Sequence, residues 1–237
     1  MPPVFWWLLL GHLVGDFPLQ TEGIFRVKTD RPWGVVLHGS ISGAIGFLAA
    51  LPYLYRVEAL LYLGLLWVFH IVLDRGKMFL VSRFKRGSVF LFIVDQGIHL
   101  GSFWLVGLAL QGTAPLWSRF YLSPRVIQYV QILSAYVATT YAAMFTISLV
   151  RENLGLRPNP SSVGSIALQF AERVLITTLI AMGGAWAICY LLVPVSLLPR
   201  SLSLFKEAEP KRLVDLGLSL VLGVLVGLAL KPVFSGR

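Results

Sequence analysis

Seven long apolar stretches, separated by short polar connections, constrain this chain more than any other feature of its sequence. They cover residues 4–20, 34–55, 58–81, 88–112, 126–150, 166–195 and 212–233. Each is close to the roughly 20 residues that a helix needs to cross the hydrocarbon core of a bilayer. Because 57% of the residues are hydrophobic and only 13% are charged, we expect an all-α, polytopic transmembrane helix bundle. The count is about seven spans, with six or eight as alternatives.

The organisation predicted from these stretches is one transmembrane domain over residues 1–237. Most prolines lie in or beside the connections, where helices are expected to end, and we find no internal repeat. The first stretch has no Lys or Arg before it and no cleavage pattern of small residues, so we expect it to be retained as a helix. Residues 1–112 form a four-helix half that carries the polar residues of interest, and residues 113–237 supply supporting helices.

The charge pattern predicts the orientation and excludes some partners. The net charge is +9, and the basic residues lie mostly in the short connections. More of them fall on the side that holds the first, third and fifth connections and the C-terminus, so the positive-inside rule predicts that this side is cytoplasmic. No basic patch with interleaved aromatic residues indicates a nucleic-acid partner. The lone Cys189 provides neither a disulfide framework nor a thiolate metal site.

Three histidine–aspartate pairs occur inside the predicted helices. His12 precedes Asp16 by four residues, His70 precedes Asp74 by four, and Asp95 precedes His99 by four. On a helix this spacing places both side chains on one face, one turn apart. The fourth histidine of the chain, His38, has no carboxylate partner at helical spacing. Counted along antiparallel helices, all these side chains lie roughly 6 to 18 Å from the same membrane surface, so we expect four helices to bring them to one level.

Ionisable groups in hydrocarbon are costly, and they usually face a bundle interior and mark a functional site. Neutral imidazole and carboxylate groups form a ligand set that suits zinc, manganese or iron. We therefore expect one or two divalent metal ions, most readily zinc, and a metal-bound water as nucleophile. The predicted metal ligands are His12, Asp16, His38, His70, Asp74, Asp95 and His99.

Other polar residues lie at depths that would complete such a pocket. Asp74, Lys77, Arg75 and Glu172 are the predicted catalytic residues, the two cations serving to stabilise a substrate anion. Gln20, Gln96 and Arg173 are predicted to support the ligands. The alternative for Lys77 and Arg75 is a snorkelling role at the interface, and the alternative for Glu172 and Arg173 is a structural pairing with another helix.

The same residues also fit a purely structural role. A His–Asp pair within a membrane can simply hold two helices together, for about 0.6 kcal/mol on average. Gly223 and Gly227 form a GxxxG pattern typical of a helix packing face, and a homodimer through it is left open.

The stretch HLVGDFPLQ, followed by LHG, FHIVLDRGK and VDQGIH, resembles the prokaryotic membrane proteins of domain-of-unknown-function family 3307. The resemblance covers residues 12–99; beyond it, Gly164–Arg173 resembles that family's Gly-then-Glu-Arg segment, whereas a more extended acidic-aromatic motif is expected where Asp215 stands. More distantly, the polar pattern is similar to that of inner-membrane metal-dependent hydrolases of the YdjM type, themselves similar to zinc-dependent phospholipase C. The resemblance implies the same seven metal ligands and a prokaryotic inner (cytoplasmic) membrane location.

These observations together predict an intramembrane metal-dependent hydrolase of a phosphoester or other lipid-related substrate, with its site in the cytoplasmic half. Its partners would be membrane lipids and a small-molecule or lipid substrate. The first alternative is a metal-ion or proton transporter that uses the same cluster. The second is a structural or accessory membrane protein in which the polar pairs only lock helices together.

Overall fold

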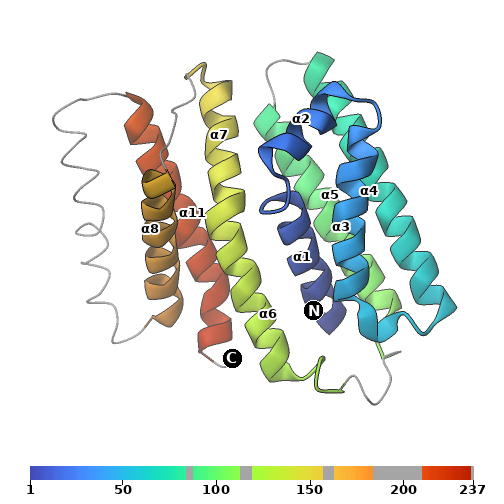
Figure 1. Cartoon of the computed structure of the whole chain (residues 1–237). Helices are drawn as coiled ribbons and strands as arrows, with labels where there is room; N and C mark the ends of the chain where they lie inside the picture. Colours follow the sequence, from blue (N-terminus) through green and yellow to red (C-terminus); the bar gives the residue numbers. More distant parts are fainter. Residues whose placement is uncertain (84–87, 113–118, 157–162, 184–209, 236–237) are drawn as a thin grey trace. The chain divides into compact units, whose positions relative to one another are not determined.

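The computed structural model describes residues 1–83, 88–112, 119–156, 163–183 and 210–235, and within these ranges the regular structure is entirely helical (Figure 1). The all-α prediction is confirmed. The chain divides into two compact units, Met1–Ser134 and Ala135–Arg237, each of which is described by itself below.

The described residues of the first unit form six helices and the 3₁₀ turn η1. They are α1 (Pro3–Asp16), α2 (Glu22–Asp30), α3 (Gly34–Ala49), η1 (Leu51–Tyr53), α4 (Val57–Arg83), α5 (Ser88–Ala109) and α6 (Pro124–Val137), the last of which continues into the second unit. Local signals explain several boundaries. A proline starts α1, the Thr21 side chain accepts a hydrogen bond from the Ile24 backbone N–H at the start of α2, and Pro52 lies in η1, after α3 ends.

Two short apolar helices leave the predicted number of spans unconfirmed. α1 has 14 residues and α3 has 16, so at 1.5 Å per residue they reach only about 21 and 24 Å, less than the roughly 30 Å of the hydrocarbon core. Five helices in the described residues are long and apolar enough to cross a membrane: Val57–Arg83, Ser88–Ala109, Pro124–Asn153, Gly164–Met182 and Val214–Phe234. Seven spans are therefore not confirmed, because the stretches 4–20 and 34–55 include apolar residues of turns. The end of the stretch 166–195 lies outside the described residues.

α3 packs closely against both α1 and α2 in the first unit. A Cβ atom on Gly15 of α1 would lie 2.6 Å from Ser42 Oγ of α3, and one on Gly34 of α3 would lie 1.9 Å from the Val27 carbonyl oxygen of α2, so these contacts require glycine. The apolar core gathers where α1 begins, around Val4, Phe5 and Leu8.

The outer face of α4 shows a contrasting pattern. Leu61, Leu65, Val68 and Val72 form a stripe along it and are 50 to 60% exposed, which suits a surface that contacts lipid. His70 and Asp74 of the same helix are buried on its opposite side, as described in the next subsection.

The second unit contains the remaining helices. After α6 the chain continues as one long helix through the π-helical turn η3 (Ala138–Ala142) into α7 (Ala143–Asn153), and α8 (Val163–Met182) and α11 (Pro210–Phe234) are the other helices among its described residues (Figure 1). Gly223 packs on Ile176 and Gly227 on Ile180, so α8 and α11 run parallel. Arg151 at the end of α7 forms a 2.5 Å ion pair with Asp215 near the start of α11. Within this unit, the C-terminal end of α11 is therefore at the end opposite Arg151.

Candidate metal centre

Four helices of the first unit place all seven predicted ligands in one buried cluster. α1 carries His12 and Asp16, α3 carries His38, α4 carries His70 and Asp74, and α5 carries Asp95 and His99. None of these residues is more than 7% exposed. Helical spacing of four aligns each pair on the inward face of its helix, while the outward faces stay apolar.

Asp16 is at the centre of the histidines. Its Oδ1 atom lies 3.6 Å from His12 Nδ1 and 3.5 Å from both His38 Nε2 and His70 Nε2. The same oxygen accepts a 2.8 Å hydrogen bond from the Ser42 hydroxyl of α3. His38, which has no acidic partner along its own helix, thus acquires one from α1.

Asp74 is bound by two lysines. Lys28 Nζ donates to its Oδ2 atom at 2.7 Å, and Lys77 Nζ lies 3.0 Å from Oδ1. Lys77 also donates to Asp95 Oδ2 at 2.7 Å. His38 Nε2 lies 3.3 Å from Asp74 Oδ2, so the lysine–aspartate chain joins the histidine cluster directly.

Lys28 and Ser42 are not among the site residues predicted from the sequence, where Lys28 counts only as one of the basic residues of the first connection. Lys28 lies on α2, is 6% exposed, and also donates to Gln20 Oε1 at 3.3 Å. A signal was present in the sequence: Ile24 and Val27 precede Lys28 by four and one residues, so the lysine lies on the apolar face of a short amphipathic helix. A lysine on the apolar face of a short helix whose other charged residues lie elsewhere indicates that its ammonium group has a buried partner.

Two overlapping triads have donor atoms close enough to hold a metal ion. They are His12/His70/His99 and Asp16/His38/His70, and the donor atoms of each lie within 4.8 Å of one another. The 3.5 Å separations around Asp16 Oδ1 approach the roughly 3.4 Å between ligands of a tetrahedral zinc ion with 2.0–2.1 Å bonds. The Nε2 atoms of His38, His70 and His99 are buried and have no hydrogen-bond partner among the described residues. The donor set therefore fits a divalent metal.

The remaining predicted residues have different surroundings. Gln96 contacts His12 Nε2 at 3.3 Å and donates to Asp95 Oδ2 at 3.1 Å. Arg75 is exposed, so it lies outside the buried cluster. Glu172 and Arg173 belong to α8 in the second unit, where they are 3% and 1% exposed. A role for this pair at the metal centre stays a prediction.

The fold and the cluster define a class of protein: an α-helical protein with membrane-length apolar helices and a buried His/Asp/Lys site built by five of its helices. The chain belongs to the family of proteins of unknown function DUF3307, whose sequence model matches residues 4–125. The matched region contains every residue of the cluster. No curated protein and no solved structure matches the chain.

Proposed function

We propose that this protein is an intramembrane metal-dependent hydrolase that acts on a phosphoester or other lipid-related substrate. The observation that supports this most is the pair of buried triads that share His70. Zinc is the ion that the imidazole-rich donor set suits best. When bound, such an ion supplies a water of lowered pKa as nucleophile.

The charges of the cluster favour one ion over two. Three aspartates and two lysines leave one net negative charge if the four histidines are neutral. Lys28 and Lys77 neutralise Asp74 and Asp95 at 2.7 Å, so Asp16 is the carboxylate without a lysine. A single divalent cation near Asp16 offsets that charge, whereas a second would leave a large positive excess in a buried site.

Metal binding and stabilisation of the substrate are assigned to different residues of the chain. Asp16, His38 and His70 hold the ion, and Ser42 fixes the Asp16 carboxylate. Lys77, the more exposed of the two lysines with 20% of its side chain accessible, is placed to stabilise a substrate anion. Asp74, held by both lysines, orients them. Arg75 is assigned to the interface because it is exposed.

A cation or proton transporter is the second candidate. The observation in its favour is the continuous chain of ion pairs Lys28–Asp74–Lys77–Asp95, since relays of ionisable groups within membranes are typical of proton pathways.

The proposed location is the inner (cytoplasmic) membrane of a prokaryote, with a revised orientation. A seven-span topology places Arg151 and the C-terminus on the same side. Because α11 starts beside Arg151, we instead place the C-terminus on the side opposite Arg151. Lys211 and Arg212, at the start of α11, lie at the same end as Arg151. Because this end carries several basic residues, the positive-inside rule predicts that it is cytoplasmic.

Elemental analysis of detergent-purified protein tests the proposed metal centre. After incubation with zinc and removal of free ions, the wild type is expected to retain about one equivalent. His70→Ala should lose it because both triads include that residue, whereas Glu58→Ala, an exposed carboxylate on the same helix, should retain it. Size-exclusion chromatography and circular dichroism confirm that each variant is folded. Absence of metal from the wild type would refute the hydrolase mechanism.

A second measurement separates the two candidates in metal-loaded protein. The hydrolase proposal expects release of phosphate or a headgroup from phospholipid vesicles and no zinc or proton flux across proteoliposomes. Flux that His70→Ala abolishes, without any release, would instead identify a transporter.

A further inference from the structure

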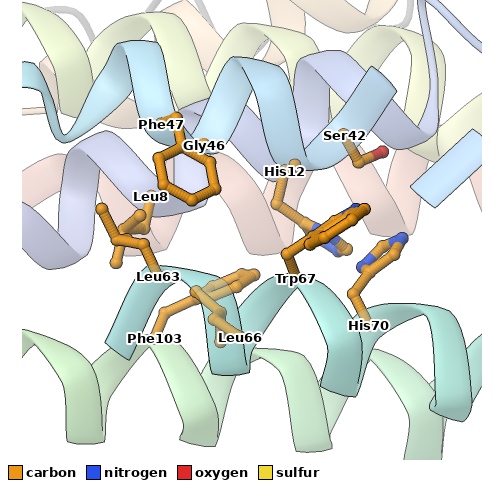
Figure 2. Close-up of a pocket in the computed structure, with 11 residues that line it drawn as sticks. Leu8, His12, Ser42, Gly46, Phe47, Leu63, Leu66, Trp67, His70 and Phe103 are labelled. Carbon is orange, nitrogen blue, oxygen red and sulfur yellow. The ribbon is translucent and has the colours of Figure 1, made fainter. Parts of the chain in front are cut away.

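A cavity in the first unit continues from the histidine cluster into the apolar part of the bundle. The open space that it encloses, including its mouth, is about 390 Å³. Figure 2 shows Leu8, Phe47, Leu63 and Phe103 towards one end and His12, His70 and Ser42 towards the other. The cavity therefore has a polar end at the candidate metal centre and an apolar end away from it.

A buried polar atom without a hydrogen-bond partner borders this cavity. The Trp67 indole Nε1–H is buried and has no such partner among the described residues. An unpaired buried donor is costly, so a ligand with an acceptor oxygen near its apolar portion would satisfy the tryptophan.

We infer that this cavity binds the acyl chain of an amphiphilic substrate, with the polar linkage of that substrate at Trp67 and its head at the histidine cluster. Among the described residues that line the cavity, His12 and His70 are the ionisable ones, so its walls suit a hydrocarbon chain better than a charged headgroup. This inference rests on the proposed function and specifies its substrate class. It also gives a reason for the location of the proposed hydrolytic site within a membrane, where acyl chains surround the protein.

The glycines of α3 provide a selective way to fill the cavity. A Cβ atom on Gly43 would lie 2.4 Å from Trp67 Cδ1, so substitution there would displace the indole. Gly46 also lines the cavity, but a Cβ atom there would meet nothing within 4 Å. Gly46→Leu therefore adds a side chain to free space. Gly101→Leu on α5 is the matched control, because Gly101 is exposed and an added Cβ there also meets nothing.

Photo-crosslinking tests the inference directly. Detergent-purified protein is irradiated with a phosphatidic acid that carries a diazirine on its acyl chain, and labelled peptides are mapped by mass spectrometry. We expect labels in residues 43–47 and 63–67 that excess dioctanoyl phosphatidic acid or octanoic acid removes. Labels on the exposed outer face of α4 should resist competition. The competitor that acts at lower concentration identifies a phospholipid or a free fatty acid as the source of the chain.

The two glycine variants give the deciding comparison. Gly46→Leu should weaken competition about tenfold, because its side chain displaces buried methylenes of the ligand, and Gly101→Leu should match the wild type. Competitor-insensitive labelling in the wild type, or equal competition in Gly46→Leu and the wild type, would overturn the inference. Zinc content is measured on the same samples: zinc without competed labelling contradicts the acyl site alone, and competed labelling without zinc contradicts the metal proposal alone.

Discussion

The ion pair between Lys28 and Asp74 provides the sharpest test of how the site is built, because it joins a short connecting helix to the centre of the cluster. The Lys28 Nζ and Asp74 Oδ2 atoms are 2.7 Å apart, and the two side chains are 7% and 0% exposed. At an effective dielectric constant of 20, the Coulomb attraction at that distance is about 6 kcal/mol. Desolvation of both charges offsets much of it.

Removal of one partner of a buried pair costs about 3 to 5 kcal/mol. Asp74 keeps Lys77 at 3.0 Å in a Lys28→Met variant, so we expect a loss near the lower bound, about 3 kcal/mol in the free energy of unfolding. Asp74→Asn should cost a similar amount. The double variant should lose less than the sum of the two, with a coupling free energy of about 2 kcal/mol. The assay is SDS-titrated unfolding in mixed micelles with EDTA present, so that bound metal does not contribute.

The pair Arg26–Glu22 on the same helix is the matched control. Its atoms are 2.6 Å apart, but its side chains are 72% and 79% exposed. An exposed pair at helical spacing contributes about 0.5 kcal/mol or less, so the cycle built from Arg26→Met and Glu22→Gln should show little coupling. If the Lys28–Asp74 coupling were no larger than this, the buried position of Lys28 would be wrong.

Two further predictions follow from packing and from the direction of α11. Gly15→Ala should lower the free energy of unfolding by about 1 to 3 kcal/mol, because the added carbon would lie 2.6 Å from Ser42 Oγ. Gly64→Ala is the control and should not lower it, because a carbon added there meets nothing within 4 Å. A Gly15→Ala variant with the unfolding free energy of the wild type in the same titration would contradict the packing of α1 on α3. Alkaline phosphatase fused after Phe234 should be active and the same enzyme fused after Asn153 inactive, because the Arg151 end of α7 lies beside the start of α11; equal activity of the two fusions would contradict the orientation.

The helical class and the seven candidate ligands could be read from the sequence because both depend on local rules. The apolar stretches identify the helices, and a spacing of four residues determines that His70 and Asp74 share a face wherever the helix lies. Because ionisable groups are costly in hydrocarbon, such polar faces are also expected to turn towards the interior of the bundle. These rules were sufficient to expect that side chains from four helices would meet at one level.

The tertiary structure alone decided which charges meet. Lys28 reaches Asp74 across 46 positions of the chain, and Ser42 reaches Asp16 across 26. No periodicity encodes such contacts, because they depend on how α2 and α3 pack on the other helices. The pairing of two lysines with two aspartates is what leaves Asp16 as the carboxylate of the described cluster that no lysine contacts.

The ends and directions of the helices also required the three-dimensional structure. An apolar stretch such as 4–20 does not reveal that its helix ends at Asp16, since apolar residues occur in membrane-embedded turns as well. The parallel course of α8 and α11 depends on contacts such as Gly223 with Ile176. The sequence by itself thus determined the helices and the inward faces that carry the histidines and aspartates, because hydrophobicity and helical periodicity are local. Packing between distant segments decided the ion pairs, the cavity beside His70 and the direction of the last helix.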